Sequence, residues 1–368
     1  MNSTRIRDLG ITVGSLPTGI LNKITDVPGV RVGHCTVDND RQKTGVTVIL
    51  PAEGNLYTAP ITAACHVING FGKSAGLMQI QELGTLETPI ALTGTLNVGK
   101  VHDALVSYTV EQCEKEGRSC RSVNPVVGET NDGTLSANND RPAEKAHLDA
   151  AVASACADFA EGDVGAGKGT VCFGLKGGIG SASRVMEVGD RTFTLGVLVQ
   201  TNFGCVEHLR MDGLPVGRAV VEMLREEAQE KAEAITGQDD IGSIMIIVGT
   251  DLPVSELQLG RILRRAAVGL SRAGSFVGHG SGDVVIGFTT ANRRTENTPF
   301  RTLEIISESK IETAFTAVAE CVEEAIYNSM IAADTVTGFN GREAVTVRSL
   351  NEFLPEALRR ARASAGGL

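Results

Sequence analysis

The sequence predicts one α+β domain over residues 1–368, in which layered β-sheets are covered by helices. The chain has 368 residues, 42% of them hydrophobic, so it can bury a large core. Strand-like and helix-like segments alternate along it without a change of composition that would separate two domains. Glycine is abundant, with 43 of 368 residues where about 7% is usual. Many tight turns and close backbone contacts are therefore expected.

The composition excludes several classes of protein. A net charge of −10 argues against a basic surface that binds nucleic acid, and no apolar run is long enough to span a membrane. The first residues lack the apolar core of a secretory signal, so we expect a cytoplasmic protein. The eight cysteines include no C-x-x-C pair, which argues against a zinc ribbon or a thioredoxin-like redox motif, so we expect free thiols and no metal centre.

Short β-rich segments open the chain. Residues 26–37 and 44–54 are predicted to form two strands joined by a polar turn. The small residues in 61–82 indicate a loop followed by a helix. Residues 88–99 predict a strand that leads into a helix over 98–120, so strands and helices begin to alternate here.

The middle of the chain combines turns, helices and strands. Residues 124–142 are rich in turn formers, and a long helix is predicted over 143–160, ended by Gly162. The glycine-rich β-type sequence over 170–204 predicts a β-meander. A helix over 218–236 follows, charged on nearly all sides in its second half.

The last third again alternates strands and helices. Residues 237–242 form a polar turn, the best candidate for a surface loop. The apolar run 243–251 predicts a strand covered on both faces. A helix over 256–274, a strand over 284–292 and a long helix over 311–333 complete the pattern.

Two local motifs are less informative than they first look. Residues 162–170 (GDVGAGKGT) resemble a phosphate-binding loop with Lys168 facing the phosphate. Such a loop needs a strand before it and a helix after it, and here the order is reversed, so we interpret it as a tight helix-to-strand connection. None of the six histidines has metal-ligand spacing. His279, in GHGSGD, is the one that we expect to line a pocket.

The junction between Gly242 and Ser243 suggests chemistry. A serine at the start of a buried strand is held rigidly, and a glycine before it can adopt backbone angles that other residues cannot. Attack of the Ser243 hydroxyl on the Gly242 carbonyl would form an ester and release a chain that begins with Ser243. Its α-amine titrates near neutrality and could act as a general base. Thr250, inside the strand, is a rival cleavage point.

Several segments in one order form a pattern more specific than any single motif. They are ITDVPGVRVGHCTV near the start, NPVVGETNDG in the middle, GAGKGTVCFGLKGGIGSASR, GVLVQTNFG with the later LPVGR, GSIMIIVGTDLP and SGDVVIGFTTAN. Over nearly the whole chain, this pattern resembles the peptidases that include L-aminopeptidase/D-esterase and the β-peptidyl aminopeptidases. The nylon-oligomer hydrolases are more distant relatives.

The resemblance implies a fold and a maturation step. The fold is a four-layer αββα sandwich of the N-terminal-nucleophile-hydrolase type. The chain would cleave itself between Gly242 and Ser243 into an α chain, residues 1–242, and a β chain, residues 243–368. The arginine-biosynthesis acetyltransferases resemble this architecture but use an N-terminal threonine, and Ser243 after glycine argues against them.

The resemblance also implies site residues. Ser281 corresponds to a second catalytic serine, Asp283 to the acidic residue that completes the site, and Asn202 to the donor of an oxyanion-hole amide. Glu129, in VVGETNDG, is the candidate for binding the substrate ammonium. Structural roles are the alternatives: Ser281 and Asp283 as turn caps, Asn202 as a turn residue and Glu129 as a solvated loop carboxylate.

The implied function is that of a cofactor-free serine aminopeptidase or amidase that acts through an acyl-enzyme on Ser243. Its substrates would be small peptides, amides or esters with a free amine, from which it releases the N-terminal residue, including D- or β-amino acids in some cases. No nucleic acid or membrane is expected as a partner. By resemblance the processed αβ units form a homo-oligomer. The non-enzymatic alternative is an unprocessed paralogue that only binds a ligand. Relatives carry an aromatic residue within the segment occupied here by residues 131–139, where this sequence has none, so the stereochemical preference of the pocket is left open.

Overall fold

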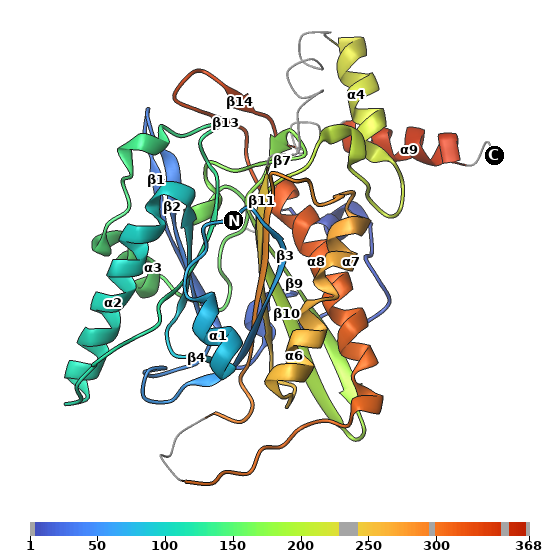
Figure 1. Cartoon of the computed structure of the whole chain (residues 1–368). Helices are drawn as coiled ribbons and strands as arrows, with labels where there is room; N and C mark the ends of the chain where they lie inside the picture. The colour runs from blue at the N-terminus through green and yellow to red at the C-terminus, as the bar shows by residue number, and fades with distance from the viewer. Residues whose placement is uncertain (1–3, 228–241, 294–298, 347–352, 366–368) are drawn as a thin grey trace.

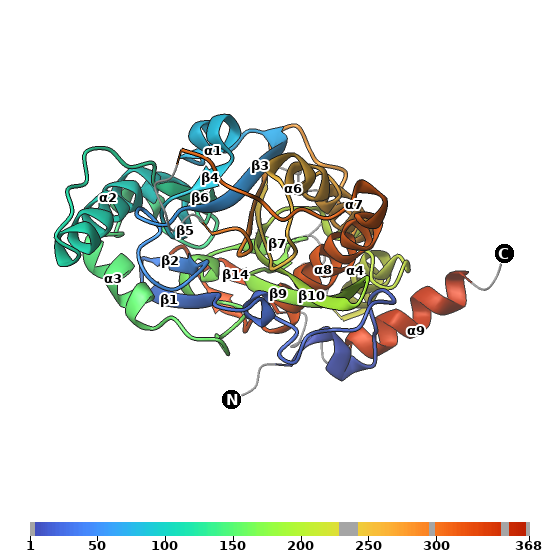
Figure 2. The ribbon, with the colours of Figure 1, turned by 90° about the horizontal axis from the view of Figure 1, so that it is seen from below.

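Two β-sheets pack face to face, and helices cover the outer face of each. The structure is a computed structural model that describes residues 4–227, 242–293, 299–346 and 353–365. The four layers run across the view in Figure 1 and are seen from below in Figure 2. The predicted α+β class and the αββα order of layers are confirmed.

The smaller sheet has the strand order β1-β2-β5-β6. Its strands are β1 (Arg31–Asp38), β2 (Lys43–Leu50), β5 (Ile90–Gly94) and β6 (Val126–Thr130). β1 and β2 form the predicted antiparallel hairpin, whereas β6 runs parallel to β5. Its outer face is covered by α2 (Val98–Lys115) and α3 (Lys145–Ala153).

The larger sheet has the order β4-β3-β12-β11-β10-β9. Its strands are β3 (Ile61–Gly70), β4 (Thr85–Leu86), β9 (Ile179–Val188), β10 (Arg191–Asn202), β11 (Ser243–Thr250) and β12 (Gly282–Thr289). Its outer helices are α6 (Glu256–Leu263), α7 (Ala266–Arg272) and α8 (Glu312–Ile331). β11 lies in the middle of the sheet, antiparallel to β10 and parallel to β12, and is buried throughout as predicted.

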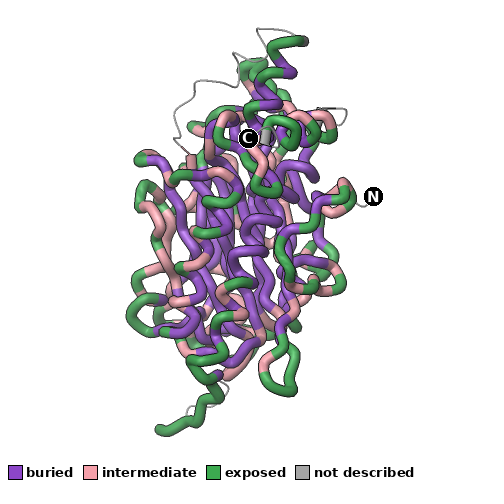
Figure 3. Tube along the Cα trace, turned by 90° about the vertical axis from the view of Figure 1, so that its right-hand side faces the viewer, coloured by how far each residue is buried: buried purple, intermediate pink, exposed green. Residues whose placement is uncertain are grey.

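Apolar side chains fill the three spaces between the four layers. Leu92, Met245, Ile247 and Ile286 belong to the cluster between the two sheets. A larger apolar cluster joins the larger sheet to its outer helices, and a smaller one joins the smaller sheet to α2 and α3. Figure 3 shows the buried strands running through the centre of the molecule. The strands around β11 are therefore held rigidly from both faces.

The remaining elements lie at the edges of the sandwich. They are α1 (Leu77–Leu83), α4 (Val216–Glu227), α9 (Phe353–Ala365) and two short hairpins, β7 (Val171–Cys172) with β8 (Leu175–Lys176) and β13 (Val336–Thr337) with β14 (Glu343–Ala344). α4 and α9 pack against each other at one end (Figure 1). All eight cysteines are free thiols, as predicted. Within the described ranges, no helix is both long and apolar enough to cross a bilayer.

Some sequence-based element boundaries are wrong. The segment predicted as a loop before a helix contains the ten-residue strand β3, in which the small Ala64 faces α6 and Ala63 faces the core between the sheets. The turn-rich segment 124–142 contains the fully buried strand β6. The loop predictions failed because both strands contain few large apolar residues, although β6 is buried throughout and β3 in its first four residues.

Two helices are shorter than predicted. α3 ends at Ala153 because the chain then turns to form a β-bridge between Val32 and Cys156. The helix predicted over 256–274 is interrupted between α6 and α7. The second half of the helix predicted over 218–236 and most of the polar turn that follows it lie outside the described residues.

Candidate active site

Ser243 occupies the first position of the central strand β11, where β10 ends and β12 begins. It pairs with Asn202 at the end of β10 and with Gly282 at the start of β12. Directly opposed residues on neighbouring antiparallel strands have Cβ atoms about 5 Å apart on the same face, so Asn202 and Ser243 lie side by side. Only 4% of the Ser243 surface is exposed.

The hydroxyl of Ser243 faces the smaller sheet. The backbone N–H of Asn131, just after β6, donates to Ser243 Oγ at 3.4 Å. The nucleophile candidate therefore sits between the start of β11 in the larger sheet and the end of β6 in the smaller sheet. The sequence did not single out Asn131, because a backbone donor leaves no signal in residue type.

The Gly242 carbonyl, which belongs to the predicted scissile bond, is held by the neighbouring strand. The backbone N–H of Gly282 donates to Gly242 O at 3.1 Å. A Cβ at position 242 would lie 2.4 Å from Phe203 Cα and 2.5 Å from Asn202 O. The structure therefore gives a steric reason for glycine at this position, a close backbone approach. The φ angle of Gly242 is not in the left-handed region, so the conformational reason expected from the sequence is not the one that applies.

Ser281 and Asp283 contact each other directly. Ser281 Oγ donates to Asp283 Oδ1 at 2.7 Å, and each residue is 1% exposed. They flank Gly282, so the start of β12 that presents these side chains also binds the Gly242 carbonyl. The hydrogen bond fixes the orientation of the Ser281 hydroxyl.

Asn69 fixes the loop that carries Ser281. Its Nδ2 donates to the carbonyls of Gly278 and His279, both at 3.1 Å, and also to the Ser281 carbonyl. His279, predicted to line a pocket, is exposed and contributes its carbonyl to this clamp. The sequence analysis missed Asn69, which lies at the end of a segment that was predicted as a loop.

Asn202 is held by the β7–β8 hairpin. Its Oδ1 accepts a hydrogen bond from the Val171 N–H at 3.0 Å. Because the oxygen end of the amide is bound in this way, the Nδ2 group is the end that can donate to a developing negative charge. Asn202 is the last residue of a strand and 7% exposed, so it is not the turn residue of the alternative interpretation.

Glu129 is a strand residue, not a loop residue, which corrects the expectation from the sequence. It lies on β6 and is 3% exposed. Its Oε1 accepts from the Lys73 N–H at 2.8 Å, and its Oε2 accepts from the Thr95 hydroxyl. A Cβ added at Gly72 would lie 3.5 Å from Glu129 Oε1 and 3.6 Å from Gly282 Cα, so this carboxylate lies close to the turn of Ser281 and Asp283.

Asp132 adds a second buried carboxyl group near Glu129. It is 2% exposed, and burial raises the pKa of its side chain to about 6. The Glu129 charge acts in the same direction, whereas Thr44 and Lys176 oppose the shift. Asp132 therefore takes up a proton much closer to neutral pH than an exposed aspartate does.

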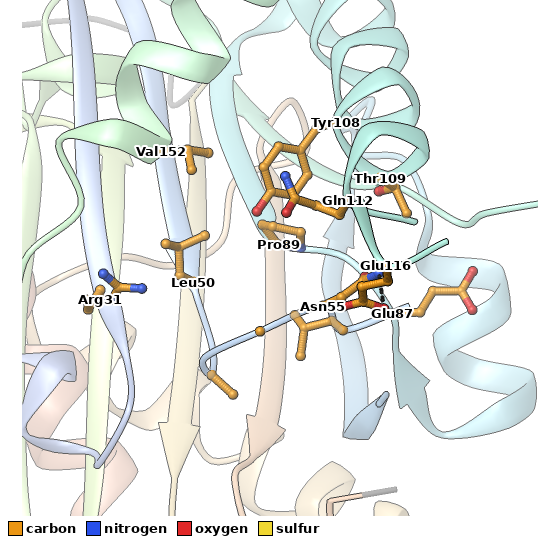
Figure 4. A pocket seen from close by; sticks show the side chains of 13 residues that line it. Arg31, Leu50, Asn55, Glu87, Pro89, Tyr108, Thr109, Gln112, Glu116 and Val152 are labelled. Atoms are coloured by element: carbon orange, nitrogen blue, oxygen red, sulfur yellow. Dashed lines mark hydrogen bonds between the residues drawn. The ribbon is translucent and has the colours of Figure 1, made fainter. Parts of the chain in front are cut away.

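Two other features lie apart from this site. Lys168, the lysine of the phosphate-loop-like segment, forms ion pairs with Asp38 at 2.8 Å and Asp163 at 2.9 Å. A cavity of about 240 Å³ lies beside α2, where Pro89, Tyr108 and Glu87 help to line it (Figure 4). Pro89 precedes the first residue of β5, whereas Glu129 pairs near its last residue, so the cavity is at the opposite end of the smaller sheet.

Comparison with known proteins identifies the class. Residues 22–344 match the model of peptidase family S58. The protein is thus a hydrolase that acts as a peptidase. The chain belongs to peptidase family S58.

Individual relatives agree with this assignment. The chain is 37% identical over 353 residues to the beta-peptidyl aminopeptidase BapA of Sphingosinicella microcystinivorans, which covers 92% of this chain and 88% of that protein. A solved beta-aminopeptidase of Burkholderia sp. has 39% identity and a TM-score of 0.85, covering 97% of this chain and 99% of that one. The L-aminopeptidase D-Ala-esterase/amidase of Ochrobactrum anthropi has 34% identity and a TM-score of 0.86, with coverage of 98% and 99%.

The last of these structures is described as a new variant among the Ntn hydrolase fold. The predicted family and the N-terminal-nucleophile-hydrolase-like fold are confirmed by these matches. The prediction of an aminopeptidase or amidase is confirmed at the level of the family and its relatives.

Proposed function

We propose that the protein is a self-processing aminopeptidase whose nucleophile is Ser243. In maturation, Ser243 Oγ attacks the Gly242 carbonyl carbon, the peptide C–N bond breaks, and an ester forms while the nitrogen becomes a free amine. Water then hydrolyses the ester and leaves a carboxylate on Gly242. The observation that carries this proposal is the Gly282 N–H donating to the Gly242 carbonyl at 3.1 Å, because it polarises the bond to be broken.

Turnover would use the same hydroxyl with a new base. The α-amine of Ser243 accepts the Oγ proton as Oγ attacks the substrate carbonyl, and that proton passes to the leaving amine. Asn202 Nδ2 donates to the oxyanion, and water afterwards hydrolyses the acyl ester on Ser243. The buried pair of Ser281 and Asp283 orients groups for proton transfer near Ser243.

Thr250 is a poorer choice of cleavage point. It lies at the far end of β11, where its hydroxyl donates to Thr194 O at 2.7 Å. A nucleophile there would be engaged inside the sheet, away from Asn202 and Gly282. The residue after Gly242 is a serine and not a threonine, which disfavours a threonine-dependent acetyltransferase.

The proposed substrates are small peptides, amides or esters that carry a free α- or β-amine. Glu129 is the candidate for the ammonium, since its carboxylate lies at the rim where β6 meets β12. Acetylation of the substrate removes the positive charge, so free aminoacyl p-nitroanilides should be cleaved and their N-acetyl forms should not. Glu129→Gln should raise KM more than it lowers kcat. Equal kcat/KM for free and acetylated substrates would leave a general amidase instead.

The cleavage itself is tested on a denaturing gel. The wild-type protein should give two chains, and N-terminal sequencing of the smaller one should begin at Ser243. That chain would have a mass of about 13 kDa, its share by length of 38.6 kDa. Ser243→Ala should leave one full-length chain, and Thr250→Ser, which retains a hydroxyl, should still give two. Persistent cleavage of the Ser243→Ala chain at the same bond would rule out the proposed nucleophile.

A further inference from the structure

Lys176 is a fully buried lysine whose ammonium group binds only backbone carbonyls. Its exposed fraction is 0%. Nζ donates to Gly167 O at 2.9 Å, to Thr170 O at 2.8 Å and to Gly177 O at 2.7 Å. All three protons of an ammonium group are thus used.

Such an arrangement is costly for the folded protein. Burial lowers the pKa of Lys176 to about 7; the charges of Asp163 and Asp132 oppose this shift, and that of Lys168 adds to it. A buried charge is ordinarily paired with a carboxylate, and in the described part of the chain no carboxylate lies within ion-pair distance of this ammonium. The position therefore calls for a reason beyond packing.

The peptide group between Thr170 and Val171 connects Lys176 to the candidate active site. Its carbonyl oxygen accepts from Lys176 Nζ at 2.8 Å, and its N–H donates to Asn202 Oδ1 at 3.0 Å. Val171 and Lys176 are also cross-strand partners in the β7–β8 hairpin. One planar amide thus has the lysine at one end and Asn202 at the other.

We propose that Lys176 is a positioning residue that orients and polarises the Asn202 amide through the Thr170–Val171 peptide group, so that Asn202 Nδ2 is a stronger and better-aimed oxyanion donor. The inference rests on the proposed function, because it needs Asn202 in that role. A cation on a carbonyl oxygen withdraws electron density through the amide and strengthens its N–H as a donor. The same effect then passes through the Asn202 amide to Nδ2, as in other cooperative hydrogen-bond chains.

Maturation and turnover should depend on Lys176 to different extents. In the uncleaved chain the Gly242 carbonyl is bound by the Gly282 N–H, which belongs to another strand and makes no use of Asn202. Loss of Lys176 should therefore reduce turnover while the chain still cleaves itself. A lysine that only stabilised the fold would affect both through the amount of folded protein.

The test is the Lys176→Met variant, expressed as the complete chain, allowed to mature and assayed with a free aminoacyl p-nitroanilide. We expect two chains on a gel, kcat lowered by about 10- to 100-fold, and KM within about twofold, since loss of an oxyanion donor acts on the transition state. Lys168→Met is the matched control, because Lys168 lies just before the β7–β8 hairpin that carries Lys176 but binds Asp38 and Asp163. It should leave kcat within about twofold. Equal losses of kcat in the two variants would overturn the proposal.

A double-mutant cycle with Asn202→Ala gives the decisive comparison. If Lys176 acts through Asn202, the double variant should be no slower than Asn202→Ala alone. Multiplying effects would show that Lys176 acts elsewhere and would overturn the inference. If Asn202→Ala itself leaves kcat unchanged, the proposed oxyanion role fails, whatever Lys176 does. Should Lys176→Met not fold, Lys176→Gln, which retains one donor group, is measured in the same cycle with the same expected non-additivity.

Discussion

Ser281 holds its hydroxyl against Asp283 at 2.7 Å, and both side chains are excluded from water. They lie two residues apart where the chain enters β12, so no distant element is needed to bring them together, and Asn69 of β3 holds the backbone of the loop before β12. A preorganised pair of this kind loses little freedom when a proton moves near it. The site thus combines side chains fixed locally with a nucleophile fixed by the sheet.

Ser281→Ala should lower kcat by roughly 10² to 10⁴, the range for loss of a positioned proton-transfer group, while the fold is retained. Stopped-flow or steady-state assays with an aminoacyl amide measure it. Ser275→Ala is the control, since Ser275 lies in the preceding loop, where its Oγ accepts from the Val277 N–H. A processed Ser281→Ala enzyme with wild-type turnover would show that the pair has a structural role alone.

Secondary-structure elements were predictable from sequence where they are rich in large apolar residues. β11 matches its predicted range closely because continuous burial gives a continuous apolar run, and α8 does so because apolar residues recur along it. β3 and β6 were hidden because alanine, cysteine, glycine and glutamate occupy much of these strands, although β6 is buried throughout and β3 in its first four residues. For the same reason Glu129 was expected on a loop, since a carboxylate inside a strand is rare until its partners are known.

The site residues divide in the same way. Ser243 and Gly242 could be singled out from a junction between a turn and an apolar run, and the resemblance to a family supplied Ser281, Asp283 and Asn202. Asn131, Asn69 and Lys176 could not be found from the sequence. Asn131 acts through its backbone N–H, whereas the side chains of Asn69 and Lys176 bind backbone carbonyls. Sequence spacing carries no information about such contacts.

The strand β1 contains a histidine whose ionisation should couple to stability. His34 contacts Thr47 Oγ1 at 2.9 Å and Ala160 O at 3.0 Å. Burial lowers its pKa from 6.5 to about 4, and the Lys23 charge adds to this, while the Ala160 carbonyl opposes it. The folded ring therefore stays neutral over a range in which the unfolded chain binds a proton.

Because the unfolded state binds more protons between pH 6.5 and 4, the free energy of unfolding should fall as the pH is lowered through this window. The loss attributable to His34 is on the order of 1–3 kcal/mol. His34→Gln should flatten this part of the stability curve, measured by urea unfolding at pH 7 and pH 4.5. The exposed His208, changed to Gln, should leave the curve as it is. Parallel curves for wild type and His34→Gln would contradict the assignment.

Across the whole molecule, buried ion pairs join the two halves that cleavage would separate. Arg184 on β9 binds Glu320 at 2.8 Å and Glu324 at 2.7 Å, both on α8. Arg7, near the start of the chain, binds Glu324 at 2.6 Å. Burial alone would raise the pKa of Glu324, but Arg7 and Arg184 outweigh it and lower the pKa. The proposed α and β chains should therefore stay together after cleavage.

Glu324→Gln should lower the unfolding temperature of the matured protein, since the buried Arg184 then keeps only Glu320 of its two carboxylate partners. Breaking a buried ion pair costs up to about 3–5 kcal/mol. Differential scanning calorimetry measures it, and size-exclusion chromatography shows whether both chains still co-elute. Glu356→Gln removes exposed contacts to Arg359 and Arg360 within α9 and should shift the unfolding temperature little. Equal shifts for the two variants would mean that the buried network does not hold the halves together.

The hydrogen bond from Gly282 to the Gly242 carbonyl has a consequence for synthesis on the ribosome. β11 leaves the exit tunnel before α6, α7 and β12. The Gly282 N–H can therefore donate to the Gly242 carbonyl only after β12 has emerged and paired with β11. In the proposed maturation, a nascent chain that stalls or is truncated before Gly282 remains uncut and has no N-terminal serine. Peptide hydrolysis would thus begin only in molecules that have been synthesised beyond Gly282. Other nascent chains nearby would be protected from hydrolysis until then.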